Sequence, residues 1–183
     1  MYEVEVKARL RDRKALVKKL EELGCKFSQE LHQIDQIFIP EGLPFPPPLG
    51  VPVLRVRKQN EIFLFTLKIN QSSRQDCLEK EIEIKDGDQM VEILKILKWQ
   101  QVPTVDKKRI KTNVGEMEIV LDTVKDLGEF IEAEKIVETA NPDDRKKTQE
   151  ELFAFLTTLG VLKEDRIIDG KYDIMLYEKF KNK

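Results

Sequence analysis

The sequence predicts an α+β fold, in which an antiparallel β-sheet closes, or nearly closes, around a charged inner face and carries helices on its apolar outer face. Three observations predict this arrangement. Charged and apolar residues alternate along at least six segments, which is the period of a strand. Charges of one sign recur two residues apart and so share one face of a strand. Three other segments repeat apolar residues at helical spacing. No repeat or linker divides the chain, so a single domain over residues 1–183 is expected.

The first strand is expected at residues 3–7, which read EVEVK. Because strand side chains alternate between faces, Glu3, Glu5 and Lys7 point to one side and the two valines to the other. Like charges side by side repel unless a cation lies between them. The N-terminal strand therefore already suggests a site for a cation.

Three segments carry apolar residues at helical spacing behind a residue that can cap a helix N-terminus. These helices are expected from Asp12 to about Leu23, from Asp86 or Asp88 to about Trp99, and from Asn141 to about Gly160. The third start is the strongest of the three, because a proline at the first helical position and two acids in the first turn follow the capping asparagine.

Most of the remaining sequence alternates as strands do. These strands are expected at residues 32–39, 53–59, 62–69, 78–85, 107–112, 116–124 and 129–137. Residues 59–61, QNE, fit a hairpin turn between two of them, and a last strand is expected near Ile174 to Tyr177. The proline-rich residues 40–52 have two interpretations, a spacer or a mobile flap over a site.

The charged strand positions fall into blocks of one sign. The basic positions are Lys7, Arg55, Arg57, Lys68, Lys107 and Arg109, and the acidic ones are Glu3, Glu5, Glu79, Glu81, Glu83, Asp122, Glu132 and Glu134. A half-exposed sheet also alternates polar and apolar residues, and for any single strand that is the simpler interpretation. The whole set argues otherwise, because these positions are nearly all ionised and Glu-x-Glu recurs on three of these strands.

Segregated blocks of charge suit two different ligands. Acidic pairs would hold a divalent cation through hard oxygen ligands, which favours magnesium, manganese or calcium. Basic pairs would hold a polyanion, since arginine makes bidentate contacts to phosphate oxygens. The glycine-rich motif GxxxxGK[ST] does not occur in the sequence, so side chains rather than backbone amides would hold phosphate.

Composition excludes several classes of function. The formal net charge of −2 argues against a nucleic-acid-binding protein, and no apolar run approaches the length of a membrane span. The single histidine, His32, excludes a histidine-rich zinc site. Two cysteines are too few for a disulfide framework, and the N-terminus is charged from Glu3 onward without an apolar signal segment. A cytoplasmic protein that binds neither nucleic acid nor membranes is expected.

An ordered set of motifs resembles one family. The motifs are EVEVK (3–7), LRVRK (54–58), TLK (66–68), EKEIEI (79–84), KKR (107–109), LDTV (121–124), LGEFIEAE (127–134) and KYDIMLY (171–177). Together they resemble the CYTH group of the triphosphate tunnel metalloenzymes, which includes class IV adenylyl cyclases and thiamine triphosphatases. The resemblance covers essentially the whole chain and implies a closed antiparallel eight-stranded β-barrel, the triphosphate tunnel, with helices packed on the outside.

The resemblance also implies roles for individual residues. Glu3 and Glu5 would be metal ligands, with Glu132 and Glu134 on the opposite wall, and Glu5, Lys7 and Glu134 would be catalytic. The residues that would contact the triphosphate are Lys7, Arg55, Arg57, Lys68, Lys107 and Arg109. Glu81, Glu83 and Asp122 would be acidic wall residues. Two Mg²⁺ or Mn²⁺ ions and a homodimer are implied as well.

The family supports more than one reaction. The overall pattern, including the long proline-rich segment between the first helix and Arg55, is most similar to the class IV cyclase branch, named for the conversion of ATP to cyclic AMP and pyrophosphate. The alternative is a triphosphatase acting on thiamine triphosphate, inorganic triphosphate or a nucleotide. An alternative of another class is a polyphosphate- or nucleotide-binding regulatory module without turnover. The acidic positions on both walls favour an enzyme, because a pure binding module could keep its basic residues and lose these carboxylates.

Overall fold

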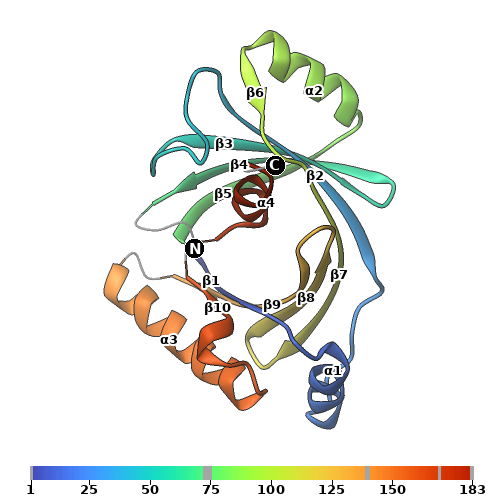
Figure 1. The fold of residues 1–183 in the computed structure, drawn as a ribbon, viewed down its shortest axis with the longest axis vertical. Coiled ribbons are helices and arrows are strands. Elements are labelled where there is room, and N and C mark those ends of the chain that lie inside the picture. Colours follow the sequence, from blue (N-terminus) through green and yellow to red (C-terminus); the bar gives the residue numbers. More distant parts are fainter. Residues whose placement is uncertain (1, 72–75, 139–140, 169, 182–183) are drawn as a thin grey trace.

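Eight antiparallel strands form a closed barrel in the computed structural model, which describes residues 2–71, 76–138, 141–168 and 170–181 (Figure 1). The order around the barrel is β1 (Tyr2–Arg9), β5 (Asp76–Ile84), β4 (Ile62–Asn70), β3 (Pro52–Gln59), β2 (Leu31–Pro40), β7 (Val105–Val114), β8 (Met117–Val124) and β9 (Gly128–Val137), which pairs with β1 again. The closed antiparallel barrel with outer helices, expected from the alternating charges and the resemblance, is therefore confirmed.

The two seams beside β1 differ in length. β1 pairs with β9 from Tyr2 opposite Val137 to Arg9 opposite Phe130. On its other side, β1 pairs with β5 at two positions in the described residues, and then with the short strand β10 (Arg166–Ile167). The barrel is consequently held firmly on one side of β1 and by short contacts on the other.

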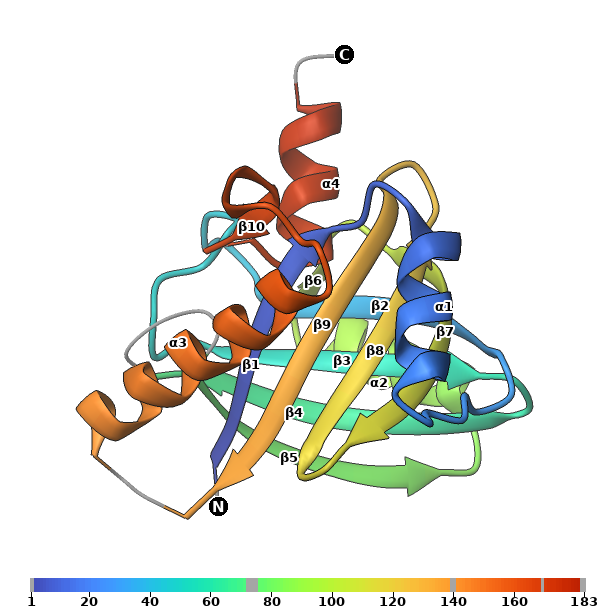
Figure 2. The ribbon, with the colours of Figure 1, turned by 90° about the horizontal axis from the view of Figure 1, so that it is seen from below.

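Three helices cover the outer apolar face (Figure 2). α1 (Arg13–Glu22) and α3 (Pro142–Thr158) pack on the outward side chains of β1, β8 and β9, where Leu20 and Leu156 are fully buried. α2 (Gly87–Ile96) covers β2 and β3 through Val91 and Leu94. Each helix begins at an expected cap, because the side chains of Asp12, Asp86 and Asn141 accept backbone hydrogen bonds from the first turns. In the described part of the chain, no helix has the length and apolar character that a membrane span requires.

The prediction of a strand near Ile174 to Tyr177 is wrong. This segment belongs to α4 (Tyr172–Phe180), which stands over one end of the barrel (Figures 1 and 2). Tyr172, Met175 and Leu176 are spaced as on one helix face and pack against inward apolar residues of the barrel, among them Phe130. Nine residues that include Ile and Tyr also satisfy a strand pattern, so the sequence alone did not separate the two.

The expected end of the second helix is also wrong. α2 ends with Leu97 as its C-cap, and the next residue, Lys98, has a positive φ of 64° that terminates the helix. Trp99 then begins the short strand β6 (Trp99–Gln101), where it lies opposite Pro40 of β2. The hairpin turn at residues 59–61 is confirmed, with Asn60 at φ 49° between β3 and β4.

Candidate active site in the barrel interior

The strand register brings the predicted charges to the inner face. Directly opposite residues of an antiparallel pair share one face of the sheet. Glu5 lies opposite Glu134, and Lys7 lies opposite Glu132. Since Val4 and Val6, the residues between these charges, are buried in the core outside the barrel, the charged members of β1 must point inward.

A cavity of about 260 Å³ occupies the barrel interior. All of the predicted site residues line it except Glu83 and Asp122. Glu83 is exposed on β5, and Asp122 lies completely buried behind the cavity wall, bound to Arg109. Eleven of the thirteen predicted side chains therefore line one cavity, as the alternating pattern led us to expect, although they come from six strands.

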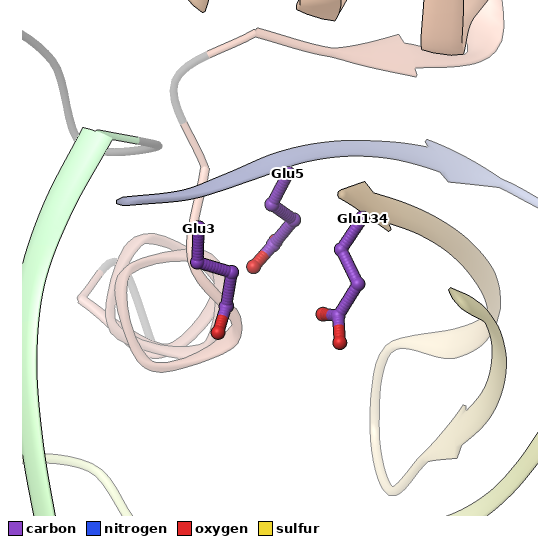
Figure 3. A group of neighbouring side chains, drawn as sticks. All are labelled: Glu3, Glu5 and Glu134. Carbon is purple, nitrogen blue, oxygen red and sulfur yellow. The ribbon is translucent and has the colours of Figure 1, made fainter. Parts of the chain in front are cut away.

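Three carboxylates gather on one part of the wall. Glu3 and Glu5 of β1 and Glu134 of β9 each offer an oxygen within 4.8 Å of the others (Figure 3). Burial, the hydrogen bond with Glu118 and the charges of Glu3, Glu118 and Glu5 raise the pKa of Glu134 to about 9. Crowded hard oxygen donors of this kind are the ligands that Mg²⁺ and Mn²⁺ prefer, so the three residues fit a divalent cation.

Glu132 lies apart from this acidic cluster, and the expectation that Glu132 and Glu134 lie on the wall opposite Glu3 and Glu5 is wrong, because β9 pairs directly with β1. Its Oε1 is 3.0 Å from Lys7 Nζ, and its Oε2 accepts a 2.6 Å hydrogen bond from Arg109 Nη2. Burial would raise the pKa of Glu132, but Lys7 and Arg109 outweigh burial and hold it well below the ordinary range. Both of its oxygens are thus engaged by cations.

Glu118 is an acidic residue of the site that sequence reasoning missed. It lies opposite Glu134 on β8, and Lys111 Nζ donates to its Oε1 at 2.5 Å. The signal was present in the sequence, because Glu118 alternates in phase with Asp122 along the same strand.

Most of the cations are held by carboxylates. Arg57 binds Asp35 in a bidentate pair, with Nε to Oδ1 at 2.6 Å and Nη2 to Oδ2 at 2.8 Å. Arg55 Nη2 donates to Glu79 at 3.2 Å and to Glu81 at 2.9 Å, while Lys68 pairs with Glu79. These pairs fix the guanidinium planes in the wall before any ligand arrives.

Carboxylates neutralise the positive charges of two lysines, Lys107 and Lys171, less completely. Lys107 meets a carboxylate oxygen of Asp122 at 3.7 Å. Burial, together with the charges of Arg109 and Arg57, lowers the pKa of Lys107 to about 7, against the smaller opposing effect of Asp122. Lys171 precedes α4, donates to Asn70 Oδ1 at 2.8 Å, and has a pKa lowered by burial and by Lys68. Both lysines line the cavity, so a bound anion would be attracted most strongly beside them. Lys171 was not predicted, because its segment was expected to lead into a strand.

Comparisons with known proteins place this barrel in a family. A family model described as the CYTH domain matches residues 1–170. A relative from Methanocaldococcus jannaschii, named "Putative adenylate cyclase MJ0240", is 32% identical over 174 residues, which are 94% of this chain and 97% of the relative. Two Pyrococcus horikoshii structures are also similar. PH1819 is 29% identical with a TM-score of 0.81, covering 97% of this chain and 99% of that chain. PH1012 is 30% identical with a TM-score of 0.76, covering 95% and 98%.

Proposed function

The chain belongs to the CYTH domain family, and from this premise we propose that it is a metal-dependent enzyme that acts on a small-molecule triphosphate inside the barrel. One observation carries the proposal: a single cavity holds an acidic cluster suited to divalent cations beside a larger set of cations suited to a polyanion. The reaction we propose is that of a class IV adenylyl cyclase, in keeping with the name of the 32% identical relative.

We assign the metal to Glu3, Glu5 and Glu134, and Mg²⁺ or Mn²⁺ suits these donors. Two such ions would neutralise phosphate charge and align the triphosphate with its nucleophile. Glu132 takes a different role in this proposal from that of a ligand. Because its two oxygens bind Lys7 and Arg109, it orients these cations toward the triphosphate.

The cations of the wall would bind the triphosphate itself. Arg55, Arg57 and Arg109 present guanidinium groups already oriented by carboxylates, which reduces the entropy lost on binding. Lys68, Lys107 and Lys171 add charge from other parts of the wall. The Nζ atom of Lys7 lies 3.1 Å from Oε1 of Glu5, at the boundary between the acidic cluster and the cations. From there its ammonium group can stabilise charge that develops on a phosphoryl oxygen during the reaction.

In the cyclase reaction, the ribose 3′-oxygen attacks the α-phosphorus of ATP. A new oxygen–phosphorus bond forms, the bond from the α-phosphorus to the bridging oxygen breaks, and pyrophosphate leaves. The hydroxyl proton must leave as well, and a divalent cation held by Glu3, Glu5 and Glu134 would favour its loss by lowering the pKa of the attacking hydroxyl.

A triphosphatase is the second candidate, in which water attacks a phosphorus of the chain and a phosphate is released. The uncharged part of the cavity lining favours it. That part is mostly apolar, with Ile37, Val53 and Val105 from three strands, and offers few groups that could recognise a base by hydrogen bonds. Thiamine triphosphate, inorganic triphosphate and nucleotides are then all candidate substrates of a triphosphatase. A binding module without turnover, by contrast, would form no product from any of them.

Product analysis tests the proposal. The protein is incubated with ATP, thiamine triphosphate and inorganic triphosphate in turn, with Mg²⁺ or Mn²⁺ and with EDTA as the control. Cyclic AMP and pyrophosphate from ATP, formed only with metal, are expected. Orthophosphate would identify a triphosphatase, and the relative rates would rank its substrates. Tight binding without any product would contradict an enzymatic role and support the binding module.

A further inference from the structure

The ring of Tyr172 lies between two lysines that come from different walls of the barrel. Lys7 Nζ of β1 is 4.1 Å from the ring centroid, and Lys107 Nζ of β7 is 5.3 Å from it. β1 and β7 are not neighbours in the barrel, because β9 and β8 separate them. α4 therefore carries one aromatic ring to a position where it contacts cations from two walls.

Packing fixes the position of this ring. Tyr172 is only 5% exposed and packs on Phe130, with ring centroids 4.9 Å apart. It belongs to an apolar cluster with Ile37, Val105 and Leu176, which closes this end of the barrel. Because close packing immobilises the ring, the more flexible side chains of the two lysines adopt positions over its face.

The hydroxyl group of Tyr172 does not explain why this side chain lies between the two lysines. Among the residues that the structure describes, the Tyr172 hydroxyl oxygen is buried and has no hydrogen-bond partner. A buried hydroxyl without a partner costs free energy rather than stabilising the fold. The face of the ring, by contrast, carries the negative part of its quadrupole and attracts ammonium groups.

We propose that Tyr172 is a positioning residue, whose ring face holds the ammonium groups of Lys7 and Lys107 where they meet the triphosphate; this rests on the proposed function. The effect is larger for Lys107 than for Lys7. Lys7 also has carboxylates of Glu5 and Glu132 at 3.1 and 3.0 Å, whereas Lys107 meets Asp122 at 3.7 Å. A flexible lysine side chain that is already held loses less entropy when an anion binds.

Paired substitutions separate the ring from the hydroxyl. Tyr172→Leu keeps an apolar side chain and removes the ring, while Tyr172→Phe keeps the ring and removes the hydroxyl. Calorimetric titration with inorganic triphosphate in EDTA, repeated with Mg²⁺ if wild type shows no heat, measures affinity. Tyr172→Leu is expected to weaken binding about tenfold, and Tyr172→Phe to stay within about twofold of wild type.

Tyr177→Leu is the matched control on α4. Tyr177 packs its ring against Phe45, and neither Lys7 nor Lys107 contacts it in the described contacts. This variant should retain the wild-type affinity, which shows that a changed tyrosine on this helix does not by itself disturb the site. If Tyr172→Leu does not fold, as judged by circular dichroism, Tyr172→Met replaces it, because methionine fills irregular space without a ring.

Two results would overturn the positioning role. Equal affinity of Tyr172→Leu and wild type would show that the ring does not act through the lysines. Equal loss in Tyr172→Phe and Tyr172→Leu would assign the effect to the hydroxyl group. Failure of the proposed function is distinct from both, because wild type itself would then not bind triphosphate in either condition, and the positioning role would fail with it.

Discussion

Glu5 on β1 lies directly opposite Glu134 on β9, so that two carboxylates face each other across the strand pair that closes the barrel. Glu3, two residues earlier on β1, brings a third carboxylate within 4.8 Å of them (Figure 3). Burial, the hydrogen bond with Glu118 and the nearby carboxylates of Glu3 and Glu5 raise the pKa of Glu134 to about 9. A divalent cation would remove the repulsion among these carboxylates, which makes the relationship the basis of the metal site proposed for this protein.

Replacing Glu5 with glutamine should lower turnover about a hundredfold or more without unfolding the protein. The substitution keeps the shape of the side chain but removes a charge from the acidic cluster. Steady-state kinetics on the substrate identified by product analysis measures the loss, and thermal unfolding checks the fold. Glu116→Gln is the control, because Glu116 is 82% exposed at the β7–β8 turn and pairs only with Lys135 among the ion pairs described. Wild-type kinetics in Glu5→Gln would refute the role given to this carboxylate.

Replacing Arg57 with alanine should weaken triphosphate binding about tenfold, since a charge-assisted contact to phosphate is lost. It should also lower the free energy of unfolding by about 3 kcal/mol, because Asp35 would remain buried without its bidentate partner. Calorimetry and chemical denaturation measure the two effects. Adding Asp35→Asn to Arg57→Ala should restore part of the stability but none of the affinity. An affinity equal to that of wild type would contradict the role of Arg57.

The affinity for triphosphate should fall as the pH rises through about 7, because Lys107 loses its proton there. Its pKa is lowered to about 7 by burial and by Arg109 and Arg57, while Asp122 opposes the shift. The ammonium form that attracts an anion therefore predominates below pH 7. Lys107→Met should bind more weakly than wild type at pH 6 and resemble it at pH 8.5. Comparing the two proteins at each pH cancels the titration of the ligand itself, and parallel profiles would show that Lys107 does not titrate in this range.

Gly87→Ala should destabilise the fold by about 1–3 kcal/mol. A Cβ atom at this first position of α2 would lie 2.2 Å from Cδ1 of the Phe63 ring, so either the ring or the helix must shift. Chemical denaturation measures the change, with Gln89→Ala at an exposed position of the same helix as the control. Equal stability of Gly87→Ala and wild type would show that α2 is free to move away from β4.

Sequence alternation predicted which side chains point inward, but not which inward neighbours meet. EVEVK placed Glu3, Glu5 and Lys7 on one face, and the structure agrees because a strand has a strict period of two. Glu132 and Glu134 looked equivalent in the sequence. The register of β9 against β1 then put Glu134 beside Glu5 and Glu132 beside Lys7, which separates their surroundings. Register depends on how the whole barrel closes, which no single strand encodes.

The closed end of the barrel was the least predictable part of the site. α4 brings Lys171 and Tyr172 to the cavity, although the segment was expected to form a strand. A nine-residue segment has little periodicity of its own, and its conformation is decided by the inward apolar residues on which Tyr172 and Leu176 pack. Such contacts between distant parts of the chain are invisible in a local pattern.

Binding of Mn²⁺ is the measurement that tests the central claim most directly. Electron paramagnetic resonance reports free Mn²⁺ and so gives the affinity of wild type and of Glu134→Gln, with Glu116→Gln as the control. The structure predicts that wild type and the control bind Mn²⁺, that triphosphate strengthens binding, and that Glu134→Gln weakens it about tenfold or more. Equal Mn²⁺ affinity in Glu134→Gln and wild type would contradict a metal site formed by Glu3, Glu5 and Glu134.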